Sequence, residues 1–132
     1  DFFPRDTKRQ GAWMTNFVNQ INLGEYNTRP MIVNVCNFTP ASGETPSLLN
    51  IDETLTLFHE FGHALHGMMT QTHYPLVSGT NVKHDFVELF SQINEHWAME
   101  PEVLKSYAKH YQTGEAIPDE LIEKIKKVYI KS

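Results

Sequence analysis

The spacing of apolar residues along the chain changes near residue 50. Before that point, two runs rich in aromatic and β-branched residues, Ala12–Val18 and Met31–Phe38, predict strands, and Met31–Cys36 is the better of the two patterns. The segments Asn22–Pro30 and Thr39–Pro46 carry glycine, proline and asparagine, so they predict loops. The first part of the chain is therefore expected to form a small antiparallel sheet.

After residue 50 the apolar positions follow a helical period. Asn50 or Asp52 can cap a first helix that runs to about Met69, and residues 71–81 read as a turn-rich connection. The other predicted helices run from about His84 to Met99, from Pro101 to near Gly114, and onward from Pro118. The predicted fold is α+β and mainly helical, with a small N-terminal sheet followed by about four helices.

Composition narrows the classes of partner. The chain has 132 residues, 40% of them hydrophobic, which suits one domain with a modest core. The net charge is −5 without a basic run, which argues against a nucleic acid partner, and no apolar run reaches membrane-spanning length. Cys36 is the only cysteine, so neither an internal disulfide nor a cysteine metal cluster can form. We expect a cytoplasmic location, with a periplasmic one as the alternative.

The segment HEFGH at residues 59–63 carries the candidate chemistry. Residues four apart lie on one face of a helix, so His59 and His63 can direct their imidazoles at one metal ion. Glu60 is offset by one residue, so it flanks such an ion and can act as a general base toward water. Gly62 weakens the helix by about 1 kcal/mol, which predicts that something packs or binds close to its backbone.

A catalytic zinc ion usually takes a third protein ligand. The metzincin spacing is excluded because His66 and Met69 stand where that class needs glycine and histidine. Thermolysin-like spacings also fail, because Val82 and Lys83 stand where those enzymes place a glutamate. We interpret His66 as a packing or hydrogen-bonding histidine.

The remaining carboxylates near the motif lie on the second predicted helix. They are Asp85, Glu88 and Glu95. Glu88 follows His63 in the first turns of that helix and is slightly favoured over Asp85, but the residues alone leave this choice open.

Several longer motifs then point in one direction. HEFGHALH at 59–66, SGTNVKHDFVE at 78–88 and SQINEHWAMEPEVL at 91–104 resemble the thimet oligopeptidase and peptidyl-dipeptidase family of zinc metallopeptidases, including its bacterial peptidyl-dipeptidases. Four further segments fit the same pattern: FFPRD at 2–6, GAW at 11–13, NVCNFTP at 34–40 and KHYQTGEAIPDEL at 109–121. The likeness covers nearly the whole chain.

The resemblance implies a zincin-like catalytic core that holds one zinc ion. By analogy, His59, His63 and Glu88 bind the zinc, and Glu60 is the general base. The family hydrolyses short peptides, and peptidyl-dipeptidases release dipeptides from the C-terminus of a substrate, so short peptides are the expected substrates.

Members of that family are several times longer than this chain. We therefore expect residues 1–132 to be the zinc-bearing core of a larger metallopeptidase, with the remainder of the parent polypeptide as a partner. The family's downstream tyrosine and histidine segment has no match here, so we expect zinc binding with little peptide cleavage by this chain alone. A zinc-binding structural domain is the main alternative, and a metal-free helical interaction module is the third.

Two segments are expected to contact substrate. A strand at Val33–Phe38 could bind the peptide by β-augmentation, although an ordinary core strand gives the same pattern. A turn at residues 78–80 is expected near the cleft. The residues concerned are Val35, Cys36, Asn37, Ser78, Gly79 and Thr80. Asp85 is a candidate for orienting a ligand histidine, with a simple helix N-terminal acid as the equal alternative.

Overall fold

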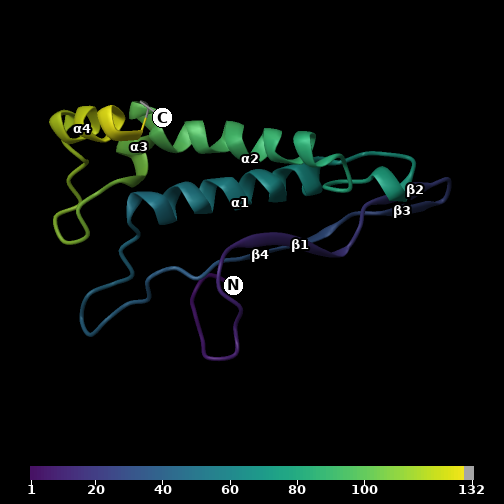
Figure 1. Cartoon of the computed structure of the whole chain (residues 1–132), viewed down its shortest axis with the longest axis horizontal. Helices are drawn as coiled ribbons and strands as arrows, with labels where there is room; N and C mark the ends of the chain where they lie inside the picture. The colour runs from purple at the N-terminus through teal and green to yellow at the C-terminus, as the bar shows by residue number, and fades with distance from the viewer. Residues whose placement is uncertain (130–132) are drawn as a thin grey trace. The chain divides into compact units, whose positions relative to one another are not determined.

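Two short antiparallel ladders form the β part of the computed structural model, which describes residues 1–129 (Figure 1). Strand β1 (Trp13–Val18) pairs with β4 (Met31–Val35), Trp13 lies opposite Val35, and the register shifts between Asn16 and Val18. A second ladder joins β2 (Ile21–Leu23) to β3 (Tyr26–Thr28). The predicted antiparallel pairing of the N-terminal part is confirmed.

The expected loop at Asn22–Pro30 is wrong. Most of it is the β2–β3 hairpin, with Leu23 opposite Tyr26 and Gly24 at a φ of +62° in the turn between them. A positive φ favours glycine, so Gly24 allows a tight reversal between two strands.

Helix α1 (Ile51–Met69) begins at a capping box. The Asn50 side chain accepts a hydrogen bond from the Glu53 N–H, and the Glu53 carboxylate accepts one from the Asn50 N–H. These reciprocal bonds satisfy two donors that a helix start leaves open. Asn50 is therefore the cap, which decides between the two candidates that the sequence offered.

Within residues 1–95, one of the two compact units of the chain, α1 contacts β1 and β4 on one face and α2 (His84–Met99) on another (Figure 1). Two glycines allow these approaches. A Cβ at Gly62 would lie 2.6 Å from the Ser91 Cα on α2, and one at Gly67 would lie 2.7 Å from the Met14 side chain on β1. The prediction that something packs close to Gly62 is confirmed. The connection from α1 to α2 contains the short 3₁₀ helix η1 (Pro75–Val77).

The second unit starts at His96 and contains α3 (Pro101–Tyr107) and α4 (Asp119–Tyr129). The third helix ends earlier than predicted, well before Gly114. After Tyr107 the chain turns back on itself through a bridge between Lys109 and Ala116, and the Ile117 N–H donates to the Ala108 carbonyl. These bonds take up backbone groups that a longer helix would need.

Two two-stranded ladders and four α-helices make the described part of the chain α+β, as predicted. No helix among residues 1–129 is long and apolar enough to cross a bilayer.

Candidate metal centre and active site

Helix α1 presents His59 and His63 one turn apart on the same face. Their rings meet edge to face, with centroids 4.8 Å apart and planes at 84°. The His63 side chain is 12% exposed and the His59 side chain 27% exposed, so both imidazoles are partly open to solvent. The helical spacing thus brings two imidazoles together at a partly open position.

Helix α2 adds the Glu88 carboxylate to this pair. Its Oε2 atom lies 3.2 Å from His59 Nε2 and 3.2 Å from His63 Nε2. The three ligand atoms of His59, His63 and Glu88 all lie within 4.8 Å of one another. Of the three carboxylates that the spacing left open, Glu88 is the one that meets both imidazoles.

Glu95 occupies the other side of His59. Its Oε1 atom hydrogen-bonds with His59 Nδ1. A carboxylate can only accept this bond, so in neutral His59 the proton sits on Nδ1 and the Nε2 lone pair faces Glu88. Asp85, the candidate for orienting a ligand histidine, is exposed, and Glu95 has that position; Asp85 fits its alternative as an acid in the first turn of α2.

These donors suit a zinc ion. When His59 is neutral and Glu88 is ionised, the His59 Nε2 lone pair and the Glu88 Oε2 atom face each other without a proton between them, an arrangement that a cation would stabilise. Two ligands bonded at about 2.0–2.1 Å in a tetrahedral site lie about 3.3 Å apart, and the two N–O separations here are 3.2 Å. Two imidazoles and one carboxylate are also a donor set of catalytic zinc sites.

Glu60 lies beside these atoms and is only 6% exposed. Burial raises the pKa of its carboxyl group; the neighbouring His59 opposes this rise and Glu88 adds to it. Its Oε2 atom is buried and has no hydrogen-bond partner. A buried carboxylate with a raised pKa and a free oxygen is suited to accept a proton.

Burial also affects the pKa values of His63 and Glu88, but the final direction of the shift has a different cause in each. Burial lowers the pKa of His63, against the opposing effect of Glu88, so its metal-binding neutral form is favoured. For Glu88, burial raises the pKa, but the hydrogen bond from Ser91 and the charges of nearby histidines outweigh burial and lower the pKa overall. The lowered pKa favours the anionic form of Glu88, which is the form that binds a cation.

The site opens into a cavity of about 410 Å³. Its walls come from β1 and the segment before it, from residues 59–63 of α1, from Thr80 in the connection between α1 and α2, and from the start of α2. The lining residues are Ala12, Trp13, Met14, His59, Glu60, His63, Thr80, Val87 and Glu88. All of them lie within the first unit of the chain.

Comparisons with known proteins identify the family of the chain. The family model of Peptidase family M3 matches residues 1–131. The chain belongs to peptidase family M3. It is 57% identical over 127 residues to the dipeptidyl carboxypeptidase of Escherichia coli (strain K12), an alignment that covers 96% of this chain and 18% of that protein.

Other M3 relatives carry oligopeptidase names. Oligopeptidase A of Escherichia coli (strain K12) is 43% identical over 127 residues, covering 95% of this chain and 19% of that protein. The thimet-like oligopeptidase of Dictyostelium discoideum is 38% identical over 128 residues, with the same two coverages. The M3 chain thus spans about a fifth of the length of the curated relatives it matches. The family resemblance expected from the motifs is confirmed.

The M3 chain places most of the expected substrate-contacting residues away from the cavity. The Cys36 N–H donates to the Asp1 carbonyl and the Phe38 N–H to the Phe2 carbonyl, so the N-terminal residues already pair with the segment after β4. Cys36 is fully buried, and the Asn37 side chain donates to the carbonyls of Arg9 and Gly11. Val35 is paired with Trp13 in the β1–β4 ladder. The candidate edge for binding a peptide is therefore β1, and not Val33–Phe38 as expected.

Of the three residues in the turn at 78–80, two lie away from the cavity and one lines it. Ser78 is buried and its hydroxyl donates to the Gln20 side chain, which makes it a structural residue. Gly79 has a φ of +59° and lies against Gly67 of α1. Thr80 alone of the six expected contacts lines the cavity, and its contact with substrate stays a prediction.

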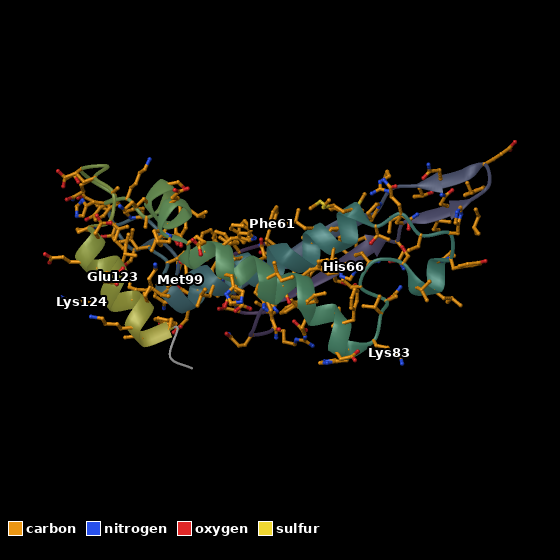
Figure 2. The ribbon with its side chains drawn as sticks, turned by 90° about the horizontal axis from the view of Figure 1, so that it is seen from above. Phe61, His66, Lys83, Met99, Glu123 and Lys124 are labelled. Carbon is orange, nitrogen blue, oxygen red and sulfur yellow. The ribbon has the colours of Figure 1, made fainter. Side chains whose placement is uncertain are left out.

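Sequence reasoning missed three contributors to the M3 site. Ser91 donates to Glu88, Asn94 donates to the Phe58 carbonyl at 2.6 Å, and Ala12–Met14 form the cavity wall. The spacing of Glu88, Ser91 and Glu95, three and then four residues apart, places these side chains on one face of α2 and could have revealed the first of them. In the sequence, the GAW segment at residues 11–13 fits the family pattern but carries no local sign of a cavity wall. His66, shown on α1 in Figure 2, packs its ring on Phe90 with centroids 4.4 Å apart, in keeping with its expected packing role.

Proposed function

We propose that this chain carries the zinc centre of a metallopeptidase that hydrolyses short peptides and releases dipeptides from their C-terminus. One observation carries the proposal: two imidazole nitrogens and a carboxylate oxygen converge in a cavity beside a buried glutamate with a free oxygen. Family membership supports peptide hydrolysis, and the name of the 57% identical relative supports the release of dipeptides.

In this proposal His59, His63 and Glu88 bind one zinc ion within a zincin-like core. Bound zinc would polarise the scissile carbonyl and make water more acidic. Glu95 keeps the proton of His59 on Nδ1, so that Nε2 is available as a ligand.

Glu60 is the proton carrier. The Glu60 side chain lines the cavity, its Oε2 atom has no hydrogen-bond partner, and its carboxylate can accept a proton from the attacking water. The raised pKa lets Glu60 hold this proton and then pass it to the leaving amine. No other carboxylate lining the cavity is free for this role, because Glu88 faces both imidazoles.

The substrate would lie along β1. This strand pairs only with β4 among the described residues, and Ala12, Trp13 and Met14 line the cavity next to the site. A peptide in an extended conformation could therefore hydrogen-bond with the free backbone groups of β1, largely independent of its sequence.

A chimera tests the function in a full-length setting. The matching 127 residues of the Escherichia coli dipeptidyl carboxypeptidase would be replaced by this chain, and release of C-terminal dipeptides from a short peptide would be followed by mass spectrometry. We expect activity that a chelator abolishes and zinc restores.

Glu60→Gln in the same chimera is the matched control. It should keep about one zinc ion while hydrolysis falls by roughly 10²–10⁴-fold, because only the proton acceptor is lost. If the chimera with the unchanged chain folds and binds zinc but does not hydrolyse the peptide, the chain is a structural zinc domain instead.

A further inference from the structure

Ser91 is a buried polar residue of α2 that the proposed mechanism does not use. Its side chain is fully buried, and its Oγ atom lies 2.9 Å from Glu88 Oε2. This is the same oxygen that faces Nε2 of both His59 and His63. We infer that Ser91 is a positioning residue, which holds the Glu88 carboxylate in its metal-binding orientation; the inference rests on the proposed function.

The direction of this hydrogen bond follows from the two acceptors around the hydroxyl. Ser91 Oγ is 2.9 Å from the Glu88 carbonyl oxygen as well as 2.9 Å from Glu88 Oε2. A hydroxyl has one proton, and an ionised carboxylate is a stronger acceptor than a neutral carbonyl. A carboxylate oxygen has two lone pairs, so Oε2 can accept from Ser91 and still bind a cation.

Helix packing fixes the position of the hydroxyl. The backbone of α2 approaches α1 so closely at Ser91 that a Cβ on Gly62 would lie 2.6 Å from the Ser91 Cα. One turn further along α2, the Asn94 side chain donates to the Phe58 carbonyl of α1. Because Ser91 is completely buried, water does not compete for its proton.

Glu88 needs such a partner. Its side chain is 34% exposed and has three rotatable bonds, so without a restraint it could turn toward solvent. A ligand that is already held in its binding orientation loses less conformational freedom when the ion binds. Ser91 therefore acts on metal affinity through Glu88 and does not itself touch the ion or the substrate.

Zinc affinity of the 132-residue chain tests the inference, measured by competition with a chromophoric chelator. Ser91→Ala should weaken zinc binding by roughly 10–100-fold, the usual effect of losing a residue that orients a metal ligand. Ser106→Ala is the matched control, because the Ser106 hydroxyl also donates to the carbonyl three residues earlier but meets no carboxylate. We expect the control to bind zinc as the wild type does.

A double-mutant cycle separates positioning from packing. If Ser91 acts through Glu88, adding Ser91→Ala to Glu88→Ala should change zinc affinity by less than about 2-fold. The visible absorption of the cobalt(II)-loaded Ser91→Ala chain should also shift, because the carboxylate ligand is no longer fixed. Equal affinities of Ser91→Ala and wild type, or an equal loss in the Glu88→Ala background, would overturn the inference. A wild-type chain that binds no zinc would overturn the proposed function itself.

Discussion

Glu60 and Glu88 line one cavity, yet their surroundings shift their pKa values in opposite directions. Glu60 is almost fully buried without a partner for Oε2, and burial raises its pKa. Glu88 is also partly buried, but the Ser91 hydrogen bond and the nearby histidines lower its pKa overall. One carboxylate is therefore suited to take up a proton and the other to remain a charged ligand.

Glu95 provides the sharpest single-residue test outside the ligand set. Glu95→Gln removes the charged acceptor from His59 Nδ1, so the imidazole is less firmly held in the tautomer that binds metal. We expect zinc affinity to fall by roughly 10–100-fold, measured by chelator competition. Asp85→Asn is the control, since Asp85 is exposed, and it should leave zinc affinity unchanged. The reverse ranking of the two variants would support the role first expected for Asp85.

How far the site could be predicted is clearest from these residues. The pair His59 and His63 follows from the four-residue helical spacing alone, and so does the offset of Glu60. The position of Glu88, by contrast, depends on how α2 lies against α1, which no local pattern encodes. The position of Glu95, and not the candidate Asp85, at His59 Nδ1 depends on the same packing.

At the level of elements, two glycines of α1 allow its close approach to neighbouring elements. Gly62 faces α2, and Gly67 faces side chains of β1 and β4. A Cβ at Gly62 would meet backbone atoms of α2, the Ser91 Cα at 2.6 Å and the Phe90 carbonyl oxygen at 2.7 Å. A Cβ at Gly67 would meet the far ends of the Met14 and Ile32 side chains. Backbone cannot give way as a flexible side chain can.

This difference predicts unequal effects of two alanine substitutions. Gly62→Ala should lower the free energy of unfolding by about 1–2 kcal/mol, because the strain of the close approach exceeds the gain in helix propensity. Gly67→Ala should change it by less than about 1 kcal/mol. Urea unfolding followed by circular dichroism measures both. A Gly62→Ala chain as stable as the wild type would mean that α1 and α2 are not packed as closely as described.

The stabilisation of the start of α1 by Glu53 depends on pH. Burial tends to raise the pKa of Glu53, but hydrogen bonds from the Thr39 N–H, the Asn50 N–H and the Thr39 hydroxyl outweigh it and lower the pKa. A lowered pKa means that the stabilisation is fully present above the ordinary pKa of glutamate, about 4.3, and is lost as the pH falls through the lower value.

Glu53→Gln should therefore cost about 1 kcal/mol of stability at pH 7, the usual value of a helix cap. It should also flatten the loss of stability below about pH 4.3, measured by urea unfolding at several pH values. Glu102→Gln is a suitable control, because Glu102 lies in the first turn of α3 but is exposed. An unchanged acid profile in Glu53→Gln would show that the capping box does not stabilise α1.

The elements themselves were predictable where local signals agree. The start and end of α2 follow from its apolar period, and the capping box marks the start of α1. The β2–β3 hairpin and the early end of α3 were missed because both depend on backbone pairing around a glycine turn, at Gly24 and Gly114. Glycine in a sequence marks a turn but does not say what the flanking residues pair with.

At the scale of the whole molecule, the described residues form two compact units, and the candidate site lies entirely in the first. Residues from four parts of the sequence build it: residues 12–14, residues 59–63, Thr80 and the first turns of α2. The sequence motifs predicted a place at the site for the last three parts. The place of residues 12–14 depends on the pairing of β1 with β4 and the packing of both on α1, which only the folded chain displays.

The central claim is that His59, His63 and Glu88 together bind one zinc ion. Native mass spectrometry of the zinc-reconstituted chain, with Glu88→Ala beside the wild type, tests it most directly. We predict one zinc ion per wild-type chain and at least about a 100-fold weaker affinity in Glu88→Ala, because losing one of three protein ligands costs more than losing a residue that only orients one. A wild-type chain without zinc, or a Glu88→Ala chain that binds zinc as tightly as the wild type, would contradict the account.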